Sequence, residues 1–286
     1  WGITDSARKK RQREFAAELG RPVVIVEDGF IRSLDIGLSK EPGMSIILDD
    51  KTSYYDATKA SRLETLLEHG PALSEAQCVR ANKAIEKIVG SRVSKYNHAP
   101  DLPLTIGKAY RKKVLLVDQR YGDQSVASGL GSEVAFEKML HDVIRTRSDC
   151  DILIKQHPDA IKGGKSSYFN NERLVFTEFM DNVHLIRFDI NPFALFDLVD
   201  EVYVVTSGMG FEALMAGKKV YCYGMPFYAG WGQTIDQLTV MRRTRSRSVE
   251  ELFYFAYIES SRYYHPEKKE VVQVEDLVDY IAANRK

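Results

Sequence analysis

The clearest fold signal in the chain is the stretch Val202-Tyr203-Val204-Val205-Thr206-Ser207-Gly208-Met209-Gly210-Phe211-Glu212. An apolar run of strand length comes first, a glycine-rich turn follows, and a helical pattern runs on to Ala216 and stops at Gly217. A strand followed by a tight turn and a helix is typical of an open α/β sheet. Ligands bind such sheets outside the carboxyl ends of the strands. The sequence therefore predicts an α/β protein with a site near Thr206 and Ser207.

The same pattern recurs toward the N-terminus. Apolar strand runs that end in polar residues occur at Val23–Val26, Val114–Val117 and Ile152–Lys155. Because polar clusters follow strand after strand, we expect one composite site between two α/β lobes. The predicted divisions are an N-terminal α/β lobe with helices over residues 1–108, a C-terminal α/β lobe over 109–247, and helices that pack back on the lobes over 248–286.

Composition excludes several classes of protein. The 286 residues carry 40 Lys+Arg against 40 Asp+Glu, and a nucleic-acid binder would normally have a basic excess. No apolar run approaches the ~18 residues of a membrane span, and no signal-peptide pattern is present. The three cysteines form no C-x-x-C pair, which fits a reducing cytoplasm. Since the chain opens at Trp1, we expect an excised module or a fragment.

Two carboxylates, Glu27 and Asp28, directly follow an apolar strand. Their side chains point in opposite directions, so at most one of them faces a given site. One interpretation is a general acid or base whose pKa is raised in a partly dry cleft. The other is a helix N-cap or an ion pair with Arg32.

A second polar loop, residues 118–125, follows the strand Val114–Val117. A carboxylate on this glycine-containing loop suits a nucleophile or base, which Gln119 and Ser125 would orient by hydrogen bonds. The alternative is a loop that Asp123 and Ser125 merely cap.

Two further clusters suit an anionic ligand. His157 and Pro158 end the strand Ile152–Lys155, where an imidazole beside Lys155 suits a phosphate or a carboxylate. The turn at Thr206–Gly210 offers backbone N–H groups and hydroxyls to the phosphate of a nucleotide. A histidine with a purely structural role and a plain strand-to-helix turn are the alternatives.

Other patterns point away from metal chemistry. Asp149-Cys150-Asp151 has the D-x-D form but precedes its strand, so we interpret it as a solvated turn. Asp49 and Asp50 lack further ligands, and the histidines show no zinc spacing.

The basic run Arg242–Arg247 is interpreted as a solvated face that could meet an anionic acceptor or a membrane surface. The aromatic residues at 253–257 have helical spacing and are expected in the core.

Several long stretches match one family arrangement. They are Val26–Ser33, Tyr54–Thr58, Ser94–Asn97, Val117–Ser125, Lys155–Asp159, Val205–Leu214 and Gly224–Gly232. On these stretches the chain resembles the KpsC-type β-Kdo glycosyltransferases of capsule synthesis over nearly its whole length. Bacterial sialyltransferases with CMP-linked donors show a looser likeness.

The resemblance implies a GT-B-like fold with two Rossmann-type lobes, a cleft between them and a helical C-terminal tail. It also implies CMP-β-Kdo as donor and transfer with retention of configuration. On this basis we expect Asp123 to be the nucleophile, with Asp118 as rival, Glu27 to be the base for the acceptor hydroxyl, and His157 to neutralise charge. Expected donor-binding residues are Gln119, Ser125, Lys155, Pro158, Thr206, Ser207, Gly208, Met209 and Glu212. Accessory candidates are Asp28, Arg32, Lys95, Asp118 and Arg120.

The expected partners follow from the same family. They are CMP-Kdo, a Kdo-containing glycolipid acceptor and a tandem glycosyltransferase module, with contact at the inner face of the inner membrane. No cofactor or metal and no nucleic acid are expected. Asp118-Gln119 followed by Gly122-Asp123 looks like the amino-terminal module, which is associated with β-(2→4) linkage. A sialyltransferase-like or UDP-sugar enzyme, a non-catalytic binding module and a peripheral membrane protein remain alternatives.

Overall fold

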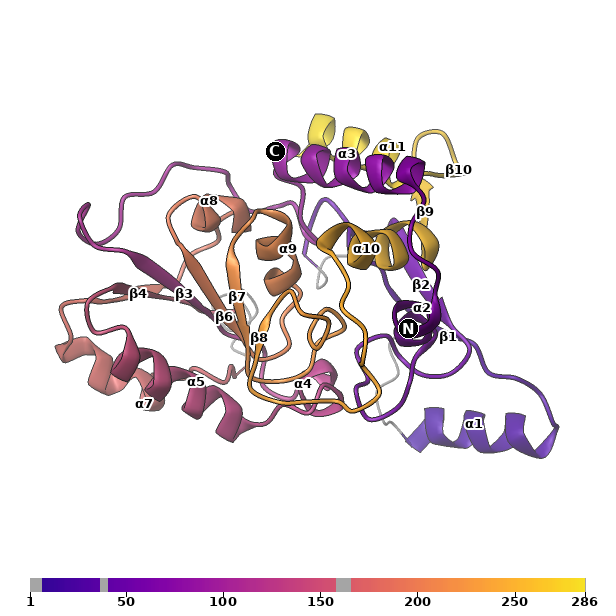
Figure 1. Ribbon diagram of the computed structural model, residues 1–286, viewed down its shortest axis with the longest axis horizontal. Coiled ribbons are helices and arrows are strands. Elements are labelled where there is room, and N and C mark those ends of the chain that lie inside the picture. The colour runs from indigo at the N-terminus through magenta and orange to yellow at the C-terminus, as the bar shows by residue number, and fades with distance from the viewer. Residues whose placement is uncertain (1–6, 37–40, 158–165, 286) are drawn as a thin grey trace. The chain divides into compact units, whose positions relative to one another are not determined.

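The computed structural model describes residues 7–36, 41–157 and 166–285, and the chain forms two compact units (Figure 1). Unit 1 combines Trp1–His98 with Arg242–Lys286, and unit 2 is the single segment Ala99–Met241. Each unit has its own sheet.

Unit 2 is built on a six-stranded sheet in the order β5-β4-β3-β6-β7-β8, and every strand pair in it is parallel. Counted within the unit, this is the 3-2-1-4-5-6 order of a doubly wound Rossmann sheet. The prediction of a Rossmann-type second lobe is therefore confirmed. The strands are β3 (Lys113–Val117), β4 (Asp151–Lys155), β5 (Val183–Ile186), β6 (Glu201–Val204), β7 (Lys219–Cys222) and β8 (Ile235–Asp236).

Helices cover both faces of this sheet, as Figure 1 shows for α5 and α7 on one side and α8 and α9 on the other. The inner strands β3 and β4 are buried throughout, in agreement with their largely apolar sequences. Phe136, Met139 and Val143 of α5 pack on one face against Val114 and Ile152. The helices are α4 (Gln124–Ser128), α5 (Glu133–Thr146), α7 (Asn171–Leu174), the 3₁₀ helix η1 (Val175–Phe179), α8 (Pro192–Phe196) and α9 (Met209–Met215).

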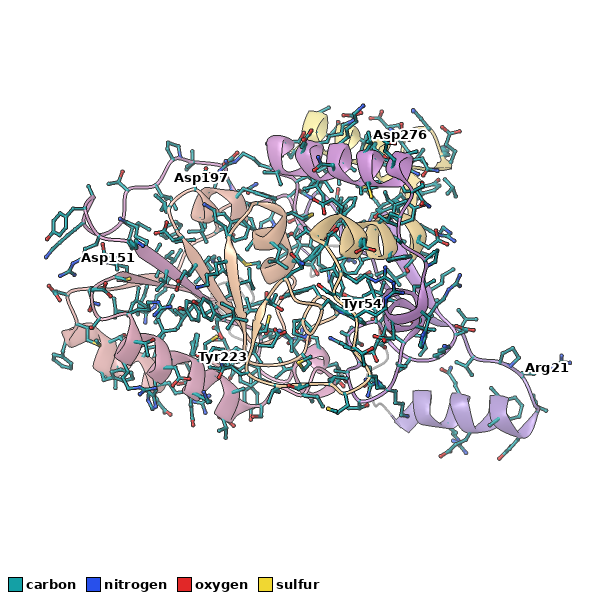
Figure 2. All side chains as sticks on the ribbon, in the orientation of Figure 1. Arg21, Tyr54, Asp151, Asp197, Tyr223 and Asp276 are labelled. Atoms are coloured by element: carbon teal, nitrogen blue, oxygen red, sulfur yellow. The ribbon has the colours of Figure 1, made fainter. Side chains whose placement is uncertain are left out.

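The D-x-D segment has a structural role at the amino end of this sheet. Asp151, labelled in Figure 2, begins β4 and is buried, whereas Asp149 is exposed. The Asp151 carboxylate accepts a hydrogen bond from the Lys108 amide at 2.6 Å and lies 3.4 Å from His184 Nε2. These contacts hold the pKa of Asp151 below its ordinary value despite burial. The interpretation as a solvated turn is therefore wrong for Asp151.

Unit 1 departs from the predicted Rossmann-type first lobe. Its four-stranded sheet has the order β1-β2-β9-β10, and all three pairings are antiparallel. A parallel neighbour would need a crossover, usually a helix, and the described residues between β1 and β2 contain none. The strands are β1 (Ile25–Asp28), β2 (Ser45–Asp49), β9 (Ser261–His265) and β10 (Glu270–Val272).

The C-terminal tail is not purely helical, which corrects a second expectation. Ser261, Tyr263 and His265 are buried and alternate with exposed neighbours, the period of a strand. Lys269 has a left-handed φ of 56° in the turn that joins β9 to β10. The predicted turn after His265 is present, but it joins strands rather than helices.

The helices of unit 1 are α1 (Ala7–Glu18), α2 (Arg62–His69), α3 (Glu75–Ser91), α10 (Val249–Phe253), the π-helix η2 (Tyr254–Glu259) and α11 (Val274–Asn284). Phe253, Phe255 and Tyr257 are buried, so the expectation that these aromatic residues belong to the core is confirmed. Within the described ranges, none of the helices combines the length and apolar character that a bilayer span requires.

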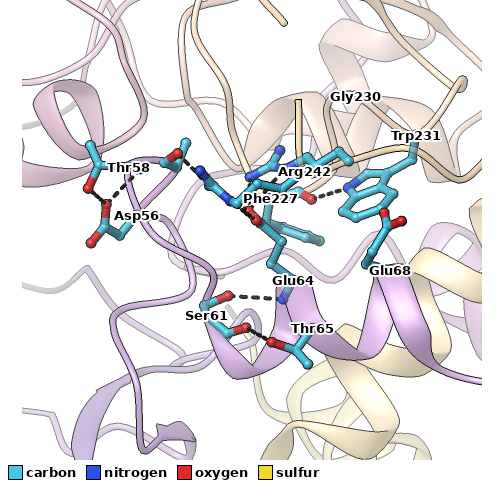
Figure 3. A network of polar contacts seen from close by, with 12 residues as sticks. Asp56, Thr58, Ser61, Glu64, Thr65, Glu68, Phe227, Gly230, Trp231 and Arg242 are labelled. Atoms are coloured by element: carbon cyan, nitrogen blue, oxygen red, sulfur yellow. Dashed lines mark hydrogen bonds and ion pairs between the residues drawn. The ribbon is translucent and has the colours of Figure 1, made fainter. Parts of the chain in front are cut away.

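Helix α2 binds most of the basic run Arg242–Arg247. Glu64 of α2 is buried and accepts from Arg242 Nε at 2.6 Å and Arg243 Nη2 at 3.0 Å (Figure 3). Arg247 donates to the carbonyls of Leu67 and Gly70, both at 2.6 Å, and so caps the C-terminal end of α2. The run is thus largely engaged inside unit 1 rather than a solvated face.

We expect Glu64→Gln to lower the free energy of unfolding by about 3–5 kcal/mol, because it leaves the buried Arg243 without its counter-charge. Urea unfolding measures this change. Glu68→Gln is the matched control on the same helix, since Glu68 binds Thr244 near the surface, and it should cost under about 1 kcal/mol. Equal effects of the two substitutions would contradict the assignment.

Candidate functional site

The two central strands of the unit 2 sheet, β3 and β6, mark the point where its strand order reverses. This switch point is where doubly wound sheets bind ligands. Gln119, after β3, and Thr206, after β6, join the two strand ends: Gln119 Nε2 donates to Thr206 Oγ1 at 3.1 Å, and the Thr206 amide donates to Gln119 Oε1 at 3.0 Å. Two of the predicted donor-binding residues therefore meet at the switch point.

Asp123 is tied to the same cluster as the N-cap of α4. Its Oδ1 accepts from the Ser125 amide and from Ser125 Oγ, each at 2.9 Å. Ser125 Oγ in turn lies 3.4 Å from both Gln119 Nε2 and Thr206 Oγ1. Asp123 thus caps a helix, as the alternative interpretation held, and is also held in a half-exposed hydrogen-bonded network that suits a nucleophile.

The close approach of α4 to Thr206 depends on Gly129. A Cβ atom at this position would lie 2.6 Å from Thr206 Cγ2 and 2.6 Å from the Ser125 carbonyl oxygen. No other residue type fits there without displacing the cluster.

The turn after β6 is held by its own contacts. Ser207 Oγ accepts from the Met209 amide at 3.3 Å, and the Ser207 carbonyl accepts from the buried Tyr228 hydroxyl at 2.5 Å. Gly208 is exposed at the start of α9, whereas Glu212 is buried on that helix. The turn therefore presents Gly208 to solvent on a rigid base.

Asp118 lies at the carboxyl end of β3 and is only 2% exposed. Its Oδ1 accepts from the Gln119 amide at 2.8 Å and the Phe169 amide at 3.0 Å. Burial raises the pKa of Asp118 to about 6, although the Ser167 hydroxyl and the amides of Phe169, Gln119 and His157 act in the opposite direction. Asp118 is more enclosed than Asp123, so Asp123 is the more accessible of the two carboxylates to a bound ligand.

A segment that sequence reasoning missed supports this loop. Residues 166–169 run beside residues 118–121: the Tyr121 amide donates to the Ser166 carbonyl at 2.9 Å, and the Tyr168 amide to the Gln119 carbonyl at 3.1 Å. Arg120 and Ser167 form the bridge between them. Because the partners are more than 40 residues apart and carry no shared motif, nothing in the sequence signals the pairing.

Two basic residues, Lys155 and His157, lie at the carboxyl end of β4. Lys155 is buried and its Nζ donates to the carbonyls of Gln156 at 2.9 Å and Phe188 at 3.0 Å. The His157 amide lies near Asp118, as its effect on the pKa of that carboxyl indicates. Pro158 falls outside the described residues. The Lys155 amino group is thus buried and anchored to the backbone at the end of β4.

In unit 1, Glu27 lies on β1 and binds two residues that sequence reasoning gave no role. Its Oε1 accepts from Ser53 Oγ at 3.1 Å and from the Tyr55 hydroxyl at 3.0 Å. Burial, with a contribution from the Glu27 charge, raises the pKa of Tyr55 above its ordinary value, so Tyr55 stays protonated and can donate. Tyr55 stands in the Tyr54–Thr58 stretch noted above, which was the available signal.

Asp28 points away from Glu27 and forms the ion pair with Arg32 that was the alternative for these carboxylates, at 2.9 Å. Arg32 also donates to Ser33 Oγ at 3.1 Å, and its amide donates to the Lys95 carbonyl at 2.9 Å. Lys95 Nζ lies 5.8 Å from the centre of the Tyr96 ring. The accessory candidates Asp28, Arg32 and Lys95 therefore share one region of unit 1.

Among the described residues, no group of three or more His, Cys, Asp or Glu side chains has the geometry to hold a metal ion. The Asp49 carboxylate is occupied by backbone amides, from Lys51 at 2.8 Å and from Arg62 at 2.8 Å. Asp49 thus caps the loop after β2 and the start of α2.

The family of capsule polysaccharide biosynthesis proteins matches residues 1–105 and 104–263 of the chain. The chain is 38% identical to the capsule polysaccharide modification protein LipA of Neisseria meningitidis serogroup B, over 99% of the chain and 40% of LipA. It is 34% identical to the lipopolysaccharide-processing protein LpsZ of Rhizobium meliloti, over 92% of the chain and 58% of LpsZ. The chain therefore spans only about half the length of these curated relatives or less.

Two solved structures from Thermosulfurimonas dismutans are similar as well. One is the β Kdo 2,4 transferase of KpsC, with 39% identity, a TM-score of 0.89, and coverage of 99% of this chain and 85% of that chain. The other is the β Kdo 2,7 transferase of KpsC, with 27% identity, a TM-score of 0.73, and coverage of 93% and 79%. The chain belongs to the capsule polysaccharide biosynthesis family, and the KpsC-type resemblance predicted from its motifs is confirmed.

Proposed function

We propose that the chain is a glycosyltransferase that moves Kdo from CMP-β-Kdo to a Kdo-terminated glycolipid acceptor in capsule polysaccharide biosynthesis. The observation that carries the proposal is the 39% identity, with a TM-score of 0.89, to a β Kdo 2,4 transferase over 99% of the chain. The cluster of Asp123, Ser125, Gln119 and Thr206 at the switch point of unit 2 supports it. The chemistry follows from these side chains.

Unit 2 supplies the donor side in this proposal. The donor carries a phosphate and a carboxylate, so it needs positive groups and N–H donors around it. Groups that can supply these contacts follow the carboxyl ends of three strands. They are Arg120 after β3, Lys155 and His157 at the end of β4, and the turn Thr206–Met209 after β6. They hold the phosphate while the sugar leaves.

The first step forms a covalent intermediate. An Asp123 carboxylate oxygen attacks the anomeric carbon of Kdo, the bond from that carbon to the phosphate oxygen breaks, and its electron pair leaves with CMP. The leaving group is already a phosphate, so it needs neutralisation of charge rather than a proton. The product is an ester between Kdo and Asp123.

The second step restores the enzyme. An acceptor hydroxyl attacks the same carbon, the ester bond breaks, and its electron pair returns to Asp123. Glu27 takes the proton of the hydroxyl, a role that suits a carboxylate held by the neutral donors Ser53 and Tyr55. Two displacements give net retention of the β configuration.

A β-(2→4) linkage is the product we propose. Its support is the greater similarity to the β Kdo 2,4 transferase than to the β Kdo 2,7 transferase, with 39% against 27% identity. The form Asp118-Gln119 followed by Gly122-Asp123 agrees with this choice. We also propose a location at the inner face of the inner membrane, next to a tandem module.

The deciding experiment compares donors. The purified chain is incubated with a synthetic Kdo acceptor and, in separate reactions, CMP-Kdo, CMP-sialic acid and UDP-sugars, and the product linkage is determined by NMR. We expect turnover with CMP-Kdo and a β-(2→4) product. Turnover with another donor would replace the substrate assignment, and donor binding without turnover would favour the non-catalytic module.

We further propose that transfer needs no divalent metal, because the side chains assigned above supply charge neutralisation. The rate with CMP-Kdo should therefore be the same within about twofold in EDTA and in Mg²⁺, since no Lewis acid takes part in the step. Initial rates after extensive dialysis against chelator measure this. Abolition of activity by EDTA, with rescue by a metal, would contradict the proposal.

A further inference from the structure

Asp118 lies where three segments of the candidate site meet. Its amide donates to the Lys155 carbonyl at the end of β4, at 3.0 Å. Its Oδ1 accepts from the Gln119 amide in the loop that carries Asp123 and from the Phe169 amide in the 166–169 segment. Asp118 thus contacts all three segments: its carboxylate binds the Asp123 loop and the 166–169 segment, and its amide binds the strand end that leads to His157.

The second carboxylate oxygen, Oδ2, is buried and makes no hydrogen bond of ordinary geometry to a described residue. The Ser167 hydroxyl and the His157 amide lie nearby, since both lower the pKa of this carboxyl. Several titratable or charged groups lie on the elements packed around this carboxylate. Lys155 ends β4 and His157 follows it, and Tyr168 lies on the 166–169 segment. Arg120, Tyr121 and Asp123 lie on the loop that begins with Asp118 itself.

Keeping this group ionised has a cost in stability. Burial is the largest influence on Asp118 and raises its pKa to about 6, against an ordinary value of 3.8. A protonated or apolar side chain would be easier to bury at neutral pH. A carboxylate that remains ionised although burial disfavours its charged form is more often explained by a functional role than by packing.

We propose that Asp118 is a positioning residue: its ionised carboxylate holds the Asp123 loop, the 166–169 segment and the His157 backbone in the arrangement that the transfer reaction needs. This inference rests on the proposed function, and it assigns Asp118 a role different from that of a rival nucleophile. Protonation of Asp118 removes the negative charge that strengthens the hydrogen bonds from the Gln119 and Phe169 amides, so the arrangement loosens as the pH falls through about 6.

The test is the pH profile of kcat/KM for Kdo transfer in wild type and in Asp118→Asn. We expect wild-type activity to fall as the pH drops through about 6, and the D118N profile to lack this acidic limb. At pH 8 the D118N kcat should be about 10²-fold lower, with little change in KM for CMP-Kdo, as expected for a small misplacement of reacting groups. Mass spectrometry should still detect the Kdo adduct on D118N.

Asp151→Asn is the matched control. Asp151 is a buried carboxylate in the same sheet, it also accepts from a backbone amide, and it lies at the opposite strand ends. Its pKa is lowered rather than raised, so D151N should keep the acidic limb of the wild type. An unchanged limb in D118N, or loss of the adduct in D118N, would overturn the proposal.

Amide hydrogen exchange tests the positioning role without any turnover. At one pH, Asp118→Ala should speed exchange of the Phe169 amide at least about 10-fold relative to wild type and D151N, because that N–H loses its acceptor. If wild type transfers no sugar from any donor, the proposed function fails, and the exchange result still decides whether Asp118 holds the segment. Equal exchange in all three proteins would show that it does not.

Discussion

We expect Asp123→Ala to abolish the Kdo adduct and to lower kcat by roughly 10⁴-fold or more, as the loss of a covalent nucleophile does in other enzymes. The reason is that no other carboxylate in the network of Ser125, Gln119 and Thr206 is as accessible: Asp118 is only 2% exposed. The measurement is intact-protein mass spectrometry of the enzyme trapped with CMP-Kdo, together with steady-state rates.

The substitution also removes the N-cap of α4, so a control for lost capping is needed. Ser132→Ala removes the N-cap of α5 in the same unit, where Ser132 Oγ accepts from the Ala135 amide at 3.3 Å. Each variant should lose about 1 kcal/mol of stability, and only D123A should lose activity. An adduct that still forms on D123A would show that Asp123 is not the nucleophile.

Glu27→Gln should lower kcat by about 10²–10⁴-fold while the Kdo adduct accumulates. Glutamine can still accept from Ser53 and Tyr55, so the local structure is kept, but it cannot take the proton of the acceptor hydroxyl. Attack by Asp123 does not need that proton transfer. Rapid quench with CMP-Kdo and acceptor, followed by mass spectrometry, measures the accumulation.

Asp28→Asn is the control for Glu27. Asp28 is the next residue on β1, faces the other way and forms a half-exposed ion pair with Arg32. Its loss should leave kcat nearly unchanged, since such pairs contribute little. If D28N is as impaired as E27Q, or if E27Q fails to accumulate the adduct, then Glu27 is not the base that serves the second step.

The fold of unit 2 could be predicted from the sequence because its inner strands β3 and β4 are buried on both faces. The runs at Val114–Val117 and Ile152–Ile154 are short, apolar and bounded by polar residues, so they could be recognised directly as strands. In unit 1 the same reading failed. Whether neighbouring strands are parallel is set by the connection between them, and the partner of β2 is β9, more than 200 residues away in the sequence.

In the candidate site, too, some contacts could be predicted from the sequence and others could not. Asp123, Gln119, Ser125 and Thr206 could be predicted to meet because each follows the carboxyl end of a strand or belongs to the loop there. The partners of Glu27, Ser53 and Tyr55, come from a loop after β2 whose path no local pattern reveals. Phe169 binds Asp118 through its backbone amide, so the type of its side chain could not predict the contact.

Unit 1 is assembled from both ends of the chain, with the whole of unit 2 between them. Strand β9, which lies between β2 and β10, and the arginines that bind Glu64 all come from the later segment. During synthesis unit 2 can complete its sheet first, while β2 waits roughly 10–40 seconds for its second neighbour, β9, to be made. The exposed edge of that unfinished sheet is where a chaperone, or an unwanted pairing with another nascent chain, would act.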